Sequence, residues 1–343
     1  MRAVSTPLVR NGRHRPATVL FALLFLGSLF AEGQSAFAQG RSGALRLGIA
    51  STQEQATAGT LNPFSVAAAD ATLRPNLLAG LPSASASLGG SIRQYPFGAF
   101  SADLAVPLGD GIGVGAGLRF DGVSNIDFRD PSGSDVGEGA AGRLVVSAGA
   151  GLDIGPASIG GSLRLLYSQI SDVDADRLGL AVDLSAGIGF ADRLALALQI
   201  NNVAAADRSE STAATIPADI RLAAAWRQPL ESRSVTVRTG PIGIPVSEAV
   251  TPPRYISLLT EVRVAEFDDG LLLGLGFEAV PVAIGADLPI GFRAGLNSRG
   301  EIGGGLFLGI PQLGAPGTTL AFSALHSPNL SGNAFTIGLN IVP

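Results

Sequence analysis

Residues 177–201 read RLGLAVDLSAGIGFADRLALALQIN, and this stretch decides the fold. From Leu178 to Phe190 an apolar residue stands at every second position, and Gly, Ala, Ser or Asp fills the positions between. After the short link Ala191-Asp192, the alternation resumes from Leu194 to Ile200. Successive side chains of a β-strand point to opposite faces, so a period of two predicts two strands joined by a tight turn.

The same alternation recurs along the chain, and this indicates a protein made of strands. The apolar face is unbroken, while the other face is mostly Gly, Ala and Ser with an occasional charge. The predicted strands have about 9 to 14 residues, which is longer than the usual 5 or 6. The further segments are Phe100–Leu108, Ile112–Phe120, Leu144–Ile154, Ile216–Trp226, Ile256–Val264, Ile284–Leu296, Ile302–Ile310 and Phe335–Ile341.

Long two-faced strands of this kind are typical of a transmembrane β-barrel, whose lipid side is apolar and whose lumen is polar. A closed barrel also satisfies every strand-edge hydrogen bond without water. The composition agrees, with 46 Gly, 46% hydrophobic residues and 15% charged residues, against about a quarter charged in soluble domains. Three Tyr and one Trp are few for an aromatic girdle, so the 16 Phe would supply most of it.

The connections predict the topology. Short links such as Gly155-Pro156 alternate with longer stretches at 122–142, 171–176 and 204–215, as in barrels with short periplasmic turns and long outer loops. We therefore expect an all-β, transmembrane antiparallel β-barrel of about 14 strands over residues 83–343, with both termini on the periplasmic side.

Two segments fall outside the strand pattern. Residues 228–254 are long and Pro-rich where a short turn is expected, and we interpret them as an insertion that could contain a small hairpin. Residues 39–82 lack sustained alternation and are predicted to form a short N-terminal plug or a periplasmic segment.

Residues 1–38 are predicted to be a signal peptide. Four arginines precede the apolar run Val19–Phe30, and Ala36-Phe37-Ala38 supplies a small-x-small cleavage pattern that would start the mature chain at Gln39. The run is too short for a membrane span of roughly 20 residues. We therefore expect export and a location in the outer membrane, with membrane lipid as a partner.

Composition excludes most catalytic chemistry. The chain has no Cys and no Lys, and its His residues are His14 and His326. Thiolate nucleophiles, catalytic lysines and multi-His metal sites are thereby removed. The net charge of −5 argues against nucleic acid as a partner. His326 lacks a neighbouring triad motif, so no enzyme activity and no cofactor are expected.

Three local patterns have a ligand-binding and a structural interpretation, and the structural one is preferred for each. Asp172, Asp174 and Asp176 are spaced like calcium ligands, but Arg177 and Asp183 stand where the loop needs Gly and Glu. The acidic residues of the predicted outer loop 122–142 could bind a cation, or they could keep that loop soluble. A glycine run resembles a phosphate loop, but no helix follows it. The acidic loop contains Asp127, Asp130, Asp135 and Glu138, and the glycines are Gly111, Gly113, Gly115 and Gly117.

Charged residues on the small-residue face are predicted to point into the lumen. A charge at mid-depth on the lipid face would cost about 2–4 kcal/mol. We expect Glu278 and Arg293, on adjacent strands, to form an ion pair. These charges could stabilise the lumen or line a solute path, and stabilisation is the preferred interpretation. The set comprises Arg119, Asp121, Arg164, Arg177, Asp183, Asp219, Arg221, Glu261, Arg263, Glu278 and Arg293.

A string of short motifs in order resembles the PorV/PorQ family of outer-membrane proteins, whose barrels look like those of the FadL fatty-acid transporters. The resemblance covers about residues 66–342. It rests on Ala69-Asp70-Ala71-Thr72, Asn76 with Ala79-Gly80-Leu81, Asp183–Gly187, Gln199–Asn202, Ile216–Leu222, Gly276–Glu278, Phe292–Leu296 and His326–Leu330.

This resemblance implies a non-enzymatic component of protein secretion or cell-surface assembly, like that of type IX secretion, with secreted cargo proteins or secretion-system subunits as partners. The alternative is a FadL-like passive transporter of hydrophobic or small solutes. The first role predicts a lumen blocked by side chains and by residues 39–82. The second predicts a continuous apolar path and uptake activity.

Overall fold

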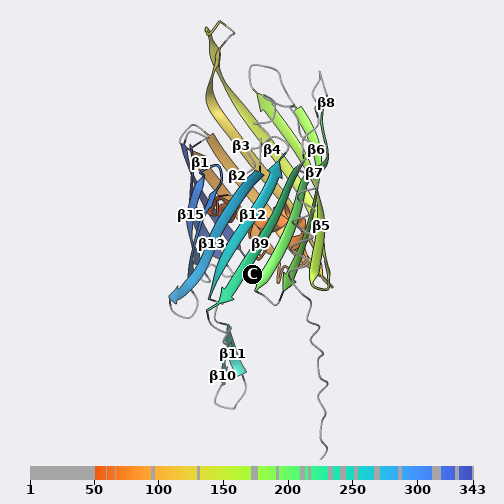
Figure 1. The fold of residues 1–343 in the computed structure, drawn as a ribbon, viewed down its shortest axis with the longest axis vertical. Helices are drawn as coiled ribbons and strands as arrows, with labels where there is room; N and C mark the ends of the chain where they lie inside the picture. The colour runs from red at the N-terminus through yellow and green to blue at the C-terminus, as the bar shows by residue number, and fades with distance from the viewer. Residues whose placement is uncertain are drawn as a thin grey trace, which may run out of the picture. The chain divides into compact units, whose positions relative to one another are not determined.

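The computed structural model describes most of the chain from residue 51 onward (Figure 1). The predicted leader, residues 1–38, and the predicted mature start at Gln39 lie outside the described residues. The described ranges are 51–58, 60–65, 67–93, 97–129, 132–170, 177–190, 193–208, 213–214, 218–230, 235–239, 245–250, 254–265, 271–284, 288–310, 318–328 and 332–341.

Fourteen antiparallel strands form a closed barrel, as the alternation predicted. Each barrel strand pairs with two neighbours, and the pairing of β6 with β7 closes the sheet. The strands are β1 (Ser85–Arg93), β2 (Phe97–Gly109), β3 (Ile112–Arg129), β4 (Asp135–Ile154), β5 (Ala157–Ile170), β6 (Arg177–Phe190), β7 (Leu194–Arg208), β9 (Asp219–Pro229), β12 (Tyr255–Ala265), β13 (Leu271–Ile284), β14 (Leu288–Asn297), β15 (Ile302–Gly309), β16 (Thr319–Ser327) and β17 (Gly332–Ile341).

Three further strands lie outside the closed ring. The short β8 (Ala213–Ala214) pairs with the end of β7. Within the Pro-rich stretch 228–254, β10 (Val235–Thr239) and β11 (Pro245–Val250) pair with each other as a separate two-stranded sheet. The stretch that contains them connects β9 to β12, at the barrel end where β1 begins and β17 ends.

The strands next to the predicted loop 122–142 are longer than expected. β3 continues to Arg129 and β4 begins at Asp135, so most of this segment is paired strand. The register shifts between Val123 and Ile126, and this irregularity interrupts the period of two that sequence reading depends on. The predicted strand Ile284–Leu296 is also corrected, because Ile284 ends β13 and β14 begins at Leu288.

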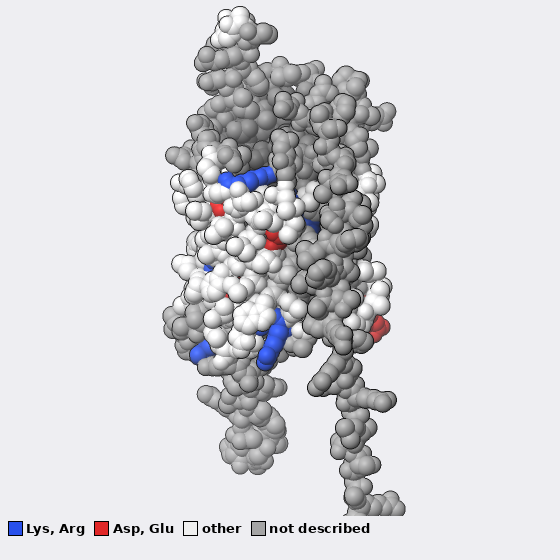
Figure 2. All heavy atoms as spheres, in the orientation of Figure 1, with Lys and Arg blue, Asp and Glu red and all other residues white. Residues whose placement is uncertain are grey.

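The two faces of the wall differ as the parity predicts. Leu104 and Leu163 point outward and are 52% and 51% exposed, whereas Ala105 and Ser257 point inward and are fully buried. On the face in Figure 2, charged atoms are sparse among the described residues of the barrel wall. Such an apolar outer band suits contact with lipid chains. Among the described residues, no helix is long and apolar enough to cross a membrane.

Residues Ser51–Leu81, here called the plug, lie inside the barrel and pack against its strands (Figure 1). The plug contains α2 (Thr52–Ala56), α3 (Ala68–Leu73) and the 3-10 helix η2 (Pro75–Leu78). α2 packs on β14 to β17, while α3 and η2 pack on β1 to β6. The apolar core inside the barrel is small and lies under the second part of the plug; it consists of Ala68, Ala71, Leu78, Leu81 and Ala105.

Candidate functional site

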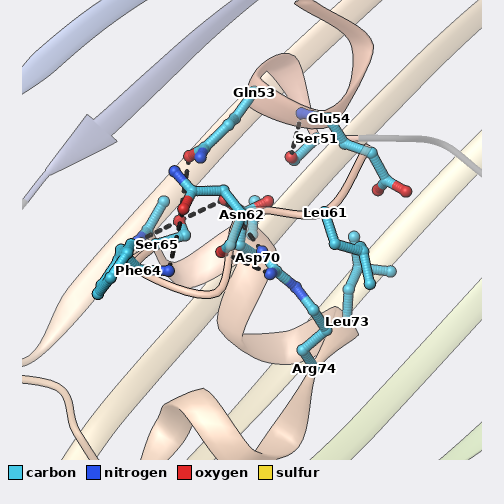
Figure 3. Close-up of polar contacts among 12 residues, drawn as sticks. Ser51, Gln53, Glu54, Leu61, Asn62, Phe64, Ser65, Asp70, Leu73 and Arg74 are labelled. Carbon is cyan, nitrogen blue, oxygen red and sulfur yellow. Dashed lines mark hydrogen bonds and ion pairs between the residues drawn. The ribbon is translucent and has the colours of Figure 1, made fainter. Parts of the chain in front are cut away.

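The plug is folded on itself through polar contacts (Figure 3). The Ser51 hydroxyl caps α2 by accepting a hydrogen bond from the Glu54 amide at 3.1 Å. The Ser65 hydroxyl donates to Gln53 Oε1 at 3.1 Å and also contacts the Asp70 carboxylate. Arg74 donates to the Asn62 carbonyl at 2.7 Å and pairs with Asp70 at 3.5 Å. These contacts join the α2 region of the plug to the α3 region.

Glycines of the wall let the plug backbone approach the strands closely at two places, which are here called glycine seats. Beneath η2, a Cβ added at Gly113 would lie 1.9 Å from the Leu78 carbonyl oxygen. A Cβ at Gly151 would lie 2.3 Å from the Pro75 carbonyl oxygen, a separation that real Cβ atoms essentially never show. The backbone of η2 therefore approaches β3 and β4 at a distance that only glycine allows. Gly113 belongs to the glycine run that resembled a phosphate loop.

The second glycine seat lies beneath the end of α2. A Cβ at Gly295 would lie 2.3 Å from the Thr57 carbonyl oxygen, and one at Gly303 would lie 2.5 Å from the Gln55 carbonyl oxygen. The small residues on the lumen face therefore make room for the plug, and this accounts for much of the glycine content of these strands.

A buried ion-pair cluster ties α2 to β9 and β12. Arg221 contacts Glu54 Oε1 at 2.6 Å and Glu261 Oε1 at 2.7 Å. Glu261 also accepts the Leu61 amide at 2.7 Å. Burial is the largest single effect on Glu54 and opposes its ionisation. The charge and hydrogen bond of Arg221, together with the charges of Arg74 and Arg263, outweigh it and hold the Glu54 pKa below its ordinary value of 4.5. The cluster therefore holds Glu54 as a carboxylate near neutral pH.

A second cluster ties α3 to β2 and β3. Arg119 pairs with Asp103 at 2.7 Å and donates to the Thr72 hydroxyl at 2.9 Å. Thr72 itself donates to Asp103 Oδ1 at 2.5 Å, and the Arg119 guanidinium also reaches the Ala69 carbonyl at 3.3 Å. Both charges are buried, and the hydrogen bonds from the plug replace part of the solvation that water would otherwise give, although Asp103 Oδ2 has no hydrogen-bond partner among the described residues.

The loop between the helices of the plug is held by an aromatic and carboxylate cluster. The Arg227 guanidinium lies between the rings of Phe64 and Tyr255, 4.2 and 4.1 Å from their centroids. The Tyr255 hydroxyl donates to Glu278 at 2.5 Å, and Asn62 Nδ2 donates to the same carboxylate at 3.3 Å. Arg227 was not singled out from the sequence, although its parity places it on the lumen face.

The predicted lumen charges all lie on buried or half-buried positions where their side chains are described. The expected pair of Glu278 and Arg293 is formed, with 2.6 Å between Oε2 and Nε. The side chain of Arg177, at the start of β6, lies outside the described part of the structure. The remaining pairs are Arg119–Asp103, Asp121–Arg143, Arg164–Asp183, Arg263–Asp219 and Arg221–Glu261.

A bulge in β7 lies next to the ion pair of Arg164 with Asp183. The register of β6 and β7 shifts between Val182 and Leu184, and Asn202 adopts a φ of 59°. Asp183 accepts the Asn202 amide at 2.8 Å, and Arg164 donates to the Asn202 side-chain oxygen at 2.7 Å. The ion pair thus satisfies the backbone group that the bulge frees.

Besides Arg227, five charged residues that the structure describes in this lumen were missed in the sequence analysis. Asp103 shares the inward parity of Ser101, so the alternation could have found it. Arg143 stands just outside its predicted strand. Glu54, Asp70 and Arg74 are in the plug, where no regular pattern indicates which side chains meet the wall.

The patterns considered for metals and catalysis find no structural counterpart among the described residues. No group of three His, Asp or Glu residues there could hold a metal ion. The triplet Asp172, Asp174 and Asp176 lies outside the described residues, as do Asp130 and the side chains of Asp127, Asp135 and Glu138. His326 is exposed, and its Nδ1 lies 2.9 Å from Asn333 Oδ1.

The comparisons with known proteins found similar folds among solved structures. No protein-family model and no curated protein matches the sequence. The toluene transporter TbuX of Ralstonia pickettii has a TM-score of 0.55 at 11% identity, over 84% of this chain and 96% of that chain. The toluene transporter TodX of P. putida has a TM-score of 0.54 at 10% identity, over 85% of this chain and 98% of that chain. The TodX deltaS2S3 mutant, a monoaromatic hydrocarbon channel, has a TM-score of 0.51 at 11% identity, over 84% and 96%.

At this level of identity the likeness shows a shared fold. The chain has the fold of outer-membrane hydrocarbon channels. The comparisons give no support to the expected resemblance to PorV/PorQ or to a type IX secretion role.

Proposed function

We propose that this protein is a passive channel of the outer membrane for small apolar solutes. The observation that carries the proposal is that a folded segment of the chain, the plug, lies inside a 14-strand barrel and packs against β1 to β6 and β14 to β17. A closure made by a segment, rather than by the wall itself, can open without unfolding the barrel. The shared fold with toluene transporters supports apolar solutes as the class.

The outer surface supports the proposed location. Large apolar side chains such as Leu104, Leu118 and Phe322 are exposed on the barrel wall. Exposed leucines and phenylalanines in water would be costly over so large an area, whereas they suit lipid chains. We therefore place the barrel in the outer membrane, with lipid as its surrounding partner.

A filled lumen also fits the role in protein secretion that the sequence suggested. The two roles differ in what passes or binds, so a direct experiment separates them. The purified protein would be reconstituted into vesicles whose outer leaflet is lipopolysaccharide, because toluene crosses a plain phospholipid bilayer without a channel. Entry of radiolabelled toluene would then be compared with that of a sugar of similar size. A channel for apolar solutes speeds toluene entry above that of protein-free vesicles and leaves sugar entry unchanged.

An experiment in cells can also distinguish the channel from the secretion role. Deletion of the gene is expected to slow uptake of toluene and to leave the secreted proteins unchanged. Unchanged uptake together with altered secreted proteins would overturn the channel proposal in favour of the secretion role.

A further inference from the structure

The apolar band on the outside of the barrel has different heights on different strands. Along β6 the outward positions carry no polar side chain from Leu178 to Phe190, and along β4 they carry none from Leu144 to Ile154. At about 3.4 Å per residue and a strand tilt of about 40°, these two runs rise about 31 Å and about 26 Å. Both therefore reach the height of about 25 Å that is usual for an outer-membrane barrel.

The band is much shorter on the neighbouring strands β16, β17 and β1, which are here called the low sector. The outward run without a polar side chain extends from Phe335 to Ile341 on β17 and from Ala86 to Ile92 on β1. By the same measure each of these runs rises about 16 Å. On β16 the run extends from Leu320 to Ala324 and rises about 10 Å. In the closed order of strands β16 stands opposite β6, so the wall is low on one side and tall on the other.

A polar pair marks one edge of the low sector. His326 is the next outward residue after Ala324 on β16, and Asn333 precedes Phe335 on β17 in the same way. The two residues are partners in the strand register, and both are exposed. His326 Nδ1 lies 2.9 Å from Asn333 Oδ1, so this contact uses only one of the two ring nitrogens. The remaining polar atoms need water or lipid headgroups, because leaving them unpaired in hydrocarbon is costly.

A wall that is lower than the hydrocarbon layer requires an adjustment of the membrane or of the protein. The bilayer becomes thinner, flanking side chains reach up to its surface, or the protein associates with another copy. Reaching up is a function of long charged side chains, whereas the polar side chains at this edge, His326 and Asn333, are short. The large apolar side chains below them are open to lipid, since Ile92, Phe335 and Phe322 are 69%, 57% and 50% exposed. Thinning of the bilayer is therefore the adjustment that these side chains favour.

We propose that the low sector is an interaction surface for lipids with short acyl chains, which gather beside β16, β17 and β1 and thin the bilayer there. Short chains match the height of this part of the wall and bring their headgroups to the level of His326 and Asn333. The inference concerns only the outer face of the barrel, so it goes beyond the proposed function and does not depend on what passes through the lumen.

Tryptophan fluorescence can test which lipids touch the low sector. Trp226 is the single Trp of the chain, so a Trp226→Phe background allows one probe to be placed at a chosen site. Ile337→Trp places it in the low sector and Leu184→Trp places it on β6, at positions that are 48% and 44% exposed. Each protein is reconstituted into an equal mixture of phosphatidylcholines with acyl chains of about 12 and about 18 carbons. The acyl chains of one lipid at a time carry bromine, which quenches a Trp that it touches.

We expect brominated short-chain lipid to quench the Ile337→Trp probe about twofold more strongly than the Leu184→Trp probe, and brominated long-chain lipid to reverse the order. Adding His326→Leu/Asn333→Leu lengthens the apolar run on β16 and β17 by one outward position each. This change should bring the quenching of the two probes closer together. Migration on gels before heating checks that every variant has folded as a barrel.

Equal quenching of the two probes by short-chain lipid would overturn the proposal. It would also be overturned if neither brominated lipid quenched the Ile337→Trp probe and the reconstituted protein had the mass of a dimer, because a second copy would then cover the low sector. Toluene entry is measured separately, so failure of the channel proposal leaves this result unchanged.

Discussion

At the residue scale, Glu278 shows how the lumen combines wall and plug. Its buried carboxylate accepts hydrogen bonds from Tyr255 and Arg293 of the wall and from Asn62 of the plug. A buried carboxylate is stable only while such donors surround it. The ion pair with Arg293 therefore contributes to the stability of the barrel, and this contribution can be measured apart from any role in transport.

Replacing Arg293 alone should destabilise the barrel more than replacing both partners. Arg293→Met leaves Glu278 as a buried charge without its ion pair, which typically costs about 3–5 kcal/mol. In Glu278→Leu/Arg293→Met the uncompensated charge is gone, so part of the loss should be recovered. Urea unfolding in lipid vesicles measures both free energies. A double variant as unstable as the single one would contradict the prediction.

Acid should loosen the contacts of α2 with the barrel wall through Glu54. Its pKa is lowered, so the stabilisation is complete above the ordinary value of 4.5 and is lost as the pH falls through the lowered pKa. Facing charges come from Arg221 of β9, from Glu261 and Arg263 of β12, and from Arg74 of the plug.

The measurement is ion conductance as a function of pH. The unmodified protein should hold a constant conductance from pH 7 to about 4.5 and rise below it. Glu54→Gln should conduct more at pH 7 and show a smaller acid step. An acid step of the same size in Glu54→Gln would assign the effect to other groups.

A charged residue of the lumen could be predicted from the sequence when its position in an alternating strand assigned it to the small-residue face. Arg221 and Glu278 were placed on the small-residue face because a charge toward lipid is costly. Asp103 follows the same rule and was simply passed over. Glu54 obeys no such rule, because its partner Arg221 is 167 residues away in the sequence and nothing local indicates the contact.

At the scale of elements, strands were predictable and helices were not. β6 and β7 were visible because lipid on one side and lumen on the other impose a period of two over many residues. α2 and α3 have five and six residues, which is too short for a helical period to show. Their positions depend on glycine seats in strands more than 30 residues away.

Two adjacent glycines of β15 give a matched test of the α2 seat. A Cβ at Gly303 would lie 2.5 Å from the Gln55 carbonyl oxygen, whereas one at Gly304 would meet nothing within 4 Å. Gly303→Ala should displace α2 from the wall and raise ion conductance, while Gly304→Ala should conduct like the unmodified protein. Equal conductance of the two variants would show that this glycine seat does not position α2 in the lumen.

At the scale of the whole molecule, the barrel and its contents follow from different interactions. The wall closes through hydrogen bonds between neighbouring strands, and the pairing of β6 with β7 completes it without any contribution from the plug. Strand count could therefore be read from local patterns. The plug depends on distant contacts such as that of Leu61 with Glu261, 200 residues apart, so its place in the lumen could only be left open as one of two alternatives.

Removing the plug should leave a folded and open barrel. Deletion of residues 51–81 keeps every strand pair and also keeps wall ion pairs such as Arg119–Asp103 and Arg221–Glu261. Water would replace the plug against these charges, so their solvation would not be lost. Selectivity should disappear, because the remaining lumen is lined by charged and small residues.

The deletion variant is expected to unfold in hot detergent at nearly the same temperature as the full chain and to migrate like a folded barrel before heating. In planar bilayers it should show a large, steady conductance, and in vesicles it should admit sugars as well as toluene. A variant that no longer migrates as a folded barrel would mean that the plug is needed to form the wall. A folded variant that still excludes sugars would mean that some other segment closes the lumen, and that outcome would remove the plug from its proposed role.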